Sequence, residues 1–105
     1  MQRRRYEVLL PIQYNDRTDV EPRKLYDSKE ELMAMFGGVT ADGVVRTGSW
    51  KDQDGVRYDD ETIRLSVDVA DTSEASLQLR DYKSTLLHRF RQKEIYIVYW
   101  LIDVV

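Results

Sequence analysis

The last twelve residues, 94–105, constrain the fold most, because they would be apolar on both faces of a strand. The segment is rich in β-branched and aromatic residues and contains no Gly or Pro, which favours a well-packed strand. A strand that is apolar on both sides must be covered on both sides. We expect the chain's own helices to cover one side and a second copy to cover the other, although a loop of the same chain is an alternative. The residues expected at this homodimer interface are Tyr96, Val98, Trp100 and Ile102.

Composition limits the classes of protein that fit. With 105 residues, 42% of them hydrophobic, the chain is expected to form a single domain, 1–105, around one core. The formal net charge of -3 makes a dedicated nucleic-acid binder improbable. The chain has no cysteine and a single histidine, so we expect no metal and no cofactor. No apolar run reaches the roughly 20 residues that span a bilayer, and no signal peptide is evident, so the expected location is cytoplasmic.

Alternating polarity predicts two strands that would lie in the centre of a sheet. From Arg5 to Leu10 the even-numbered residues are apolar, while Arg5 and Glu7 face the other way. From Thr62 to Ala70 the odd-numbered residues are apolar, and the outward residues are Thr62, Arg64, Ser66 and Asp68.

A further strand is predicted at Val44 to Lys51, before a hairpin turn at Asp54-Gly55. Asp-Gly favours a type I′ turn, in which both residues have positive φ. A two-residue turn would place Ile63 opposite Arg46, so this register requires a bulge near Asp59 and Asp60.

Two helices are predicted from capping signals and apolar spacing. Ser28 and Glu31 match the S-x-x-E capping box, so the first helix is expected to begin at Ser28, after a loop at 15–23. Gly37 is expected to end it in the left-handed conformation. The second helix is expected to run from an N-cap at 71–73 to about Arg91, with a core stripe formed by Ala75, Leu79, Tyr82, Leu86 and Phe90.

This order of elements predicts an α+β, ferredoxin-like β-α-β-β-α-β fold, an antiparallel sheet with two helices on one face. Right-handed crossovers place the first and third strands in the centre and the last strand at an edge. An edge strand that is apolar on both faces needs protection, which supports the predicted self-association.

The middle third of the chain resembles small bacterial families of unknown function. The residues that carry the resemblance are Phe36-Gly37-Gly38-Val39-Thr40, Gly48-Ser49-Trp50, Gly55 and Glu61. Those families are thought to have ferredoxin-like folds, so the resemblance implies that fold. It assigns no chemistry and no site residues.

The outward face of the two central strands is the best candidate for a ligand site. Cross-strand neighbours approach within about 5 Å, so Glu7 is expected to meet Arg64 or Ser66. Carboxylates beside a guanidinium suit a polar ligand or a proton transfer. The predicted ligand-binding residues are Glu7, Arg64, Ser66 and Asp68, and a solvated sheet face or a polar patch in a dimer interface is the alternative.

Two other clusters have simpler explanations. Asp52, Asp54, Gly55 and Glu61 match part of an EF-hand calcium loop, but Trp50 stands at the first ligand position and strands flank the segment. The basic residues of the second helix and beyond complement the helix dipole, and acidic residues interrupt them. Trp50 and Trp100 are expected to be core or interface anchors.

Three functions follow, in decreasing order of support. The first is a binding or interaction module that oligomerises through its sheet and has a protein or small-molecule partner. The second is a small enzyme of the dimeric α+β-barrel type with a pocket on the sheet face, where the candidate residues are Glu7, Arg64, Asp68 and Tyr96. The third is nucleic-acid binding. The sequence does not decide whether the chain is an enzyme, and it identifies no catalytic residue.

Overall fold

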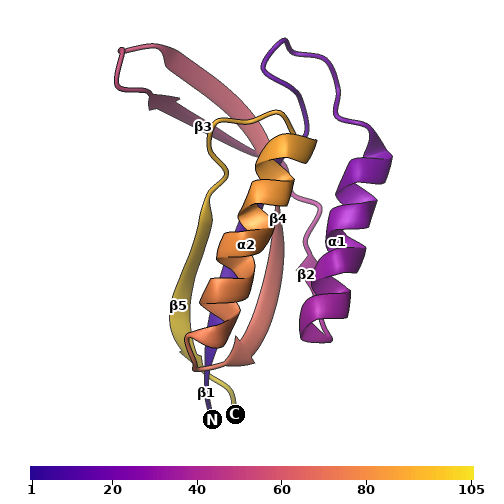
Figure 1. Cartoon of the computed structure of the whole chain (residues 1–105), viewed down its shortest axis with the longest axis vertical. Coiled ribbons are helices and arrows are strands. Elements are labelled where there is room, and N and C mark those ends of the chain that lie inside the picture. The colour runs from indigo at the N-terminus through magenta and orange to yellow at the C-terminus, as the bar shows by residue number, and fades with distance from the viewer.

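The computed structural model describes residues 1–105 and shows one antiparallel sheet with two helices on the same face (Figure 1). Neither of the two helices combines the length and the apolar character that spanning a lipid bilayer requires. The elements in chain order are β1 (Gln2–Pro11), α1 (Pro22–Phe36), β2 (Thr40–Ala41), β3 (Arg46–Lys51), β4 (Arg57–Ala70), α2 (Glu74–Arg89) and β5 (Ile97–Asp103).

The strands lie in the order β2-β4-β1-β5, and β3 pairs with the first half of β4. The predicted α+β class is therefore confirmed, with β1 and β4 in the centre and the last strand at an edge. The strict β-α-β-β-α-β order is not reproduced, because the short strand β2 adds a fifth strand that the sequence analysis did not predict. β2 pairs with the second half of β4, with Thr40 opposite Ser66.

The core lies between the sheet and the two helices. Tyr6, Val8 and Leu10 of β1 are almost fully buried, as the alternating pattern predicted. The two helices supply the other side of the core, and burying each such side chain contributes about 1.5–3 kcal/mol. The helical and β4 residues that complete it include Leu32, Leu65, Val67, Leu79, Leu86 and Phe90. Four of the five residues of the core stripe predicted for the second helix are buried, and the fifth, Tyr82, is half-buried.

Helix α1 begins six residues earlier than predicted. Pro22 occupies its first turn, where the missing backbone N–H of proline costs nothing. Ser28 is therefore a fully buried residue inside the helix, and its hydroxyl donates a hydrogen bond of 2.8 Å to the carbonyl of Lys24. The capping-box interpretation of Ser28 and Glu31 was wrong, whereas Gly37 ends the helix with φ 78° as predicted.

The β3–β4 hairpin has a longer turn than predicted. Lys51 pairs with Arg57, so five residues, 52–56, form the connection, and Arg46 lies opposite Thr62 with no need of a bulge. Only Gly55 has positive φ, so the type I′ turn was a wrong prediction. The Asp52 carboxylate instead holds the turn by accepting hydrogen bonds from the backbone N–H groups of Asp54 and Val56.

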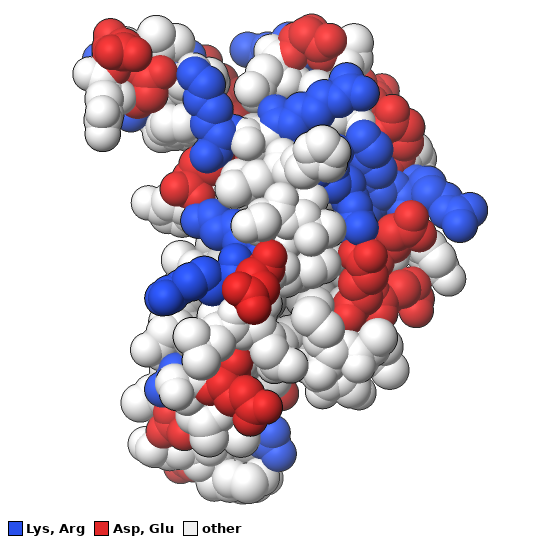
Figure 2. Space-filling model, viewed as in Figure 1, with Lys and Arg blue, Asp and Glu red and all other residues white.

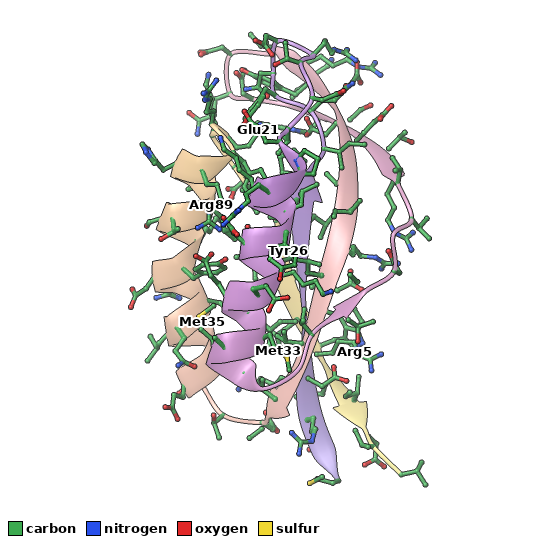
Figure 3. All side chains as sticks on the ribbon, turned by 90° about the vertical axis from the view of Figure 1, so that its right-hand side faces the viewer. Arg5, Glu21, Tyr26, Met33, Met35 and Arg89 are labelled. Carbon is green, nitrogen blue, oxygen red and sulfur yellow. The ribbon has the colours of Figure 1, made fainter.

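A polar network joins the two helices. The Arg89 guanidinium of α2 donates hydrogen bonds of 2.5 and 2.9 Å to the two carboxylate oxygens of Glu31 on α1. Tyr82 donates to the same carboxylate at 2.7 Å, and Arg89 also donates to the Ser28 hydroxyl at 2.9 Å. Figure 3 shows Arg89 beside α1. Every buried polar side-chain atom has a hydrogen-bond partner, as a polar network between two packed helices requires.

Strand β5 lies at the left edge of the sheet in Figure 1, and no element covers its outer side. Tyr99 and Leu101 face the helices but are 49% and 51% exposed. Trp100 and Val98 face the other way and are 42% and 38% exposed. The chain alone therefore leaves both faces of this strand partly uncovered, and the alternative that a loop covers it is wrong.

Candidate functional site

The face of the sheet away from the helices carries a hollow with a volume of about 570 Å³. Its floor is formed by the outward residues of β1 and β4, and one side is formed by the chain that follows α1. Figure 3 shows Arg5 on this open side, opposite the helices. The lining residues are Arg5, Glu7, Phe36, Gly37, Gly38, Val39, Thr40, Asp42, Arg64, Ser66, Asp68 and Trp100.

One ion pair in the hollow joins Arg5 to Asp68, which lie opposite each other on β1 and β4. Arg5 Nε and Nη2 donate to the two carboxylate oxygens of Asp68 at 2.8 and 2.9 Å. The hydrogen bonds from this guanidinium lower the pKa of the Asp68 carboxyl and raise the pKa of Arg5. The third guanidinium nitrogen, Nη1, has no partner in the protein and is free for a ligand.

The second ion pair joins the same two strands in the reverse sense, with its arginine on β4 and its carboxylate on β1. Arg64 of β4 donates through Nη1 to both carboxylate oxygens of Glu7 on β1, at 2.8 and 3.0 Å. The side chain of Glu7 is only 12% exposed, so its carboxylate lies low in the hollow. Asp42, after β2, lies 3.5 Å from Arg64 Nη2 and adds a second negative charge beside it.

The rim of the hollow is formed by the segment that follows α1 on one side and by Trp100 on the other. Gly37 ends α1, and Gly38 follows it, so no side chain stands at these two positions. Thr40 then lies beside Ser66, which places two hydroxyl groups next to the ion pairs. Across the sheet, Trp100 of β5 pairs with Arg5, and its exposed ring completes the lining.

This arrangement suits a small molecule that carries both charges. Within one hollow, each guanidinium can receive a carboxylate and each carboxylate can receive an ammonium. The exposed Trp100 ring offers a surface for a flat ring or a cation. The carboxylates of Asp68 and Glu7 each accept two hydrogen bonds from a guanidinium, a geometry that suits the binding of charged groups.

The structure brings together the four residues predicted as ligand-binding. Glu7 lies opposite Ser66 and is paired with Arg64, as the strand alternation predicted, and Asp68 lines the same hollow. Their role in binding stays a prediction. The sequence analysis missed Arg5, whose place on the outward face could have indicated a partner for Asp68. It also missed the side of the hollow that residues 37–42 form, because no pattern in the sequence predicts that this segment folds back along β4.

The predicted interface residues Tyr96, Val98, Trp100 and Ile102 occupy the open face next to β1. Trp100 thus belongs both to the hollow and to the uncovered strand. Trp50 is not a core residue. Its ring stacks on Tyr58 in the hairpin, with ring centroids 4.5 Å apart, and its indole N–H donates to Asp60 at 2.8 Å.

The acidic residues of the hairpin form hydrogen bonds within the hairpin itself. No group of three or more histidine, aspartate or glutamate side chains is placed to hold a metal ion. Asp52 closes the turn, and Asp59 accepts hydrogen bonds from Ser49 and Arg57. The partial match to an EF-hand loop therefore reflects the turn.

Several basic residues of the chain are engaged with acidic or aromatic neighbours. Lys83 lies 2.5 Å from a carboxylate oxygen of Glu94, and Arg91 stacks over the ring of Tyr14. Figure 2 shows the positive side chains of the helix-bearing face interspersed with negative ones. This pattern does not favour nucleic-acid binding.

Comparisons with known proteins point to one fold. No family model matches this chain. No curated protein matches its sequence. The fold is similar to that of a phage SAM lyase solved in complex with S-methyl-5′-thioadenosine, with a TM-score of 0.65 over 97% of this chain and 90% of that chain. The two sequences are 8% identical, so the likeness concerns the fold alone.

Proposed function

We propose that this protein is a binding module for a small zwitterionic molecule, held in the hollow on the open face of its sheet. The observation that carries the proposal is the pair of oppositely directed ion pairs, Arg5–Asp68 and Arg64–Glu7, fixed side by side in that hollow. A ligand with one carboxylate and one ammonium can satisfy a guanidinium and a carboxylate at once, without leaving either charge unpaired.

Each ion pair is held by two hydrogen bonds, which orients its charged groups for such a ligand. They project from the two central strands of the sheet, and each guanidinium holds both oxygens of its carboxylate. Preorganised groups bind with less loss of side-chain freedom than mobile ones. Arg5 Nη1 is the free donor for the ligand carboxylate, and Asp68 and Glu7 are the acceptors for its ammonium.

The fold comparison suggests which probe to try first. SAM, S-adenosylmethionine, combines an α-amino acid, a sulfonium cation and an adenine ring. The first part fits the charged floor, and either of the others fits the Trp100 ring. S-methyl-5′-thioadenosine lacks the amino acid, and L-methionine lacks the adenosine, so the three probes separate the two halves of the site.

Nuclear magnetic resonance titration of the labelled protein tests this proposal. We expect SAM and L-methionine to shift the backbone signals of Arg5, Glu7 and Asp68, and SAM to shift the indole signal of Trp100 as well. S-methyl-5′-thioadenosine should move the Trp100 signal with little effect on the charged floor. Shifts confined to the hairpin or the helices, or no shift with any probe, would refute the proposal.

The second candidate function is an enzyme acting on the same ligand, and the lyase named in the fold comparison favours it. The distinguishing experiment is incubation of the protein with SAM, followed by chromatography for S-methyl-5′-thioadenosine. Product released above the rate of the buffer control would establish the enzyme. Unchanged SAM that nevertheless perturbs the hollow would establish the binding module.

A further inference from the structure

We propose that β5 pairs antiparallel with β5 of a second copy, so that the sheet continues across a two-fold axis at this edge. The proposal starts from the exposure of the strand on both faces. Tyr99 and Leu101 are half exposed on the helix side, while Val98 and Trp100 are exposed on the open side. The inference concerns assembly and does not depend on the proposed ligand.

The backbone of β5 has a free edge. Leu9 N–H donates to Tyr96 C=O at 3.0 Å, and Val104 N–H donates to Met1 C=O at 2.8 Å, so even-numbered residues of this segment point their backbone groups toward β1. In an antiparallel strand, alternate residues point theirs to opposite edges. Ile97, Tyr99 and Leu101 therefore present N–H and C=O groups outward, ready for another strand.

This edge also lacks the devices that block strand pairing. Residues 97–102 of β5 contain no charge, no proline and no glycine. Strand β3, which pairs with the other side of β4, carries Arg46 and Lys51 at its ends and Gly48 within it. Charged residues and irregularities of this kind protect natural edges from pairing. The contrast assigns the pairing edge to β5.

Edge pairing explains the exposure better than packing of two open faces would. Face-to-face packing would remove water from the Arg5–Asp68 and Glu7–Arg64 ion pairs, which is costly. It would also leave Tyr99 and Leu101 uncovered, because they point to the helix side. A neighbouring strand gives the side chains on both faces of β5 new cross-strand partners.

A second copy is the occupant that this edge fits. Each copy carries the same strand, uncharged over residues 97–102 and already extended by its pairing with β1, so no segment must be ordered on binding. A two-fold axis brings two apolar strands together without opposing any charge between residues 97 and 102. Trp100 lines the hollow, so the partner's β5 would continue the floor of each hollow beside that ring.

Sedimentation of the full chain at micromolar concentration tests the pairing. The wild type should sediment with the mass of two 12.4 kDa chains. Leu101 lies opposite Arg4 of β1 within the same chain. The substitution Leu101→Glu adds a charge to the edge strand, so we expect the dimer dissociation constant to rise at least about tenfold. The control is Leu77→Glu, which makes the same change at an exposed leucine of α2 and should leave the dimer intact.

Cysteine cross-linking gives an independent test, because the natural chain has no cysteine. Single cysteines placed in turn at Val98, Tyr99, Trp100 and Leu101 should yield a disulfide-linked dimer at one or more positions, whereas Leu77→Cys should not. A wild type that sediments as one chain overturns the proposal. So does a dimer that both Leu→Glu variants leave unchanged, or a mass other than two chains.

Discussion

Arg5 and Asp68 face each other across β1 and β4, joined by two parallel hydrogen bonds of 2.8 and 2.9 Å. They lie beside the Glu7–Arg64 pair, which runs in the opposite direction between the same two strands. Outward positions of a sheet normally meet water alone. Here they share a hollow with a tryptophan ring, and this combination is what distinguishes the open face from an ordinary solvated sheet.

The first prediction concerns the charge of Asp68. Because Arg5 lowers the pKa of this carboxyl, Arg5→Met should raise it toward the ordinary value. A carboxyl with a lowered folded pKa stabilises the fold above its unfolded pKa, and this contribution is lost as the pH falls through the folded pKa. Carbon-detected magnetic resonance titration of the carboxyl measures the shift. An Asp68 titration that is the same in both proteins would contradict the assigned ion pair.

The second prediction concerns Tyr82. Burial, together with the hydrogen bond to Glu31, raises the pKa of Tyr82 to about 12. In the unfolded chain tyrosine ionises near pH ~10, so stability should fall as the pH rises from that value toward the folded pKa. The ultraviolet absorbance of the wild type minus that of Tyr82→Phe, followed against pH, should show one phenol that ionises at a higher pH than an ordinary tyrosine. A difference curve centred at the ordinary tyrosine pKa would exclude the inter-helix network around Tyr82.

The third prediction separates two adjacent glycines. Gly37 has φ 78°, and no atom stands within 4 Å of a Cβ added there, so Gly37→Ala should cost only the backbone strain, about 1–2 kcal/mol. Gly38 has equal space and no positive φ, so Gly38→Ala is the matched control and should change stability little. Urea unfolding measures both. Equal losses at the two positions would show that the cap at Gly37 is not what ends α1.

The sequence predicted most of the sheet but less of the site. Alternation in β1 and β4 was sufficient to place Glu7, Arg64, Ser66 and Asp68 on one face, because the period of a strand leaves no choice of side. The start of α1 was mispredicted, since two local signals competed and Pro22 with tertiary packing prevailed over the capping box at Ser28. No local pattern in the sequence indicates which distant segments become neighbours in the fold.

The side of the hollow illustrates that last limit. Residues 37–42 are near the ion pairs only because α1 ends at Gly37 and the chain returns along β4, with Thr40 beside Ser66. Similarly, Trp100 was expected at an interface, and its place in the hollow depends on the pairing of β5 with β1. Such neighbours can be assigned only once the strand order is known.

The most direct test of the account is a calorimetric titration with SAM and L-methionine of the wild type, Asp68→Asn and Asp71→Asn. Asp71 forms a similar ion pair with Arg4, at 2.9 Å, but does not line the hollow, so its variant is the matched control. Loss of a charged hydrogen bond costs about 1.5–3 kcal/mol, so Asp68→Asn should weaken binding about tenfold to a hundredfold. Asp71→Asn should bind as the wild type does. If neither molecule binds the wild type, or if Asp68→Asn binds as tightly as the control, the open-face hollow is not the zwitterion site that we propose.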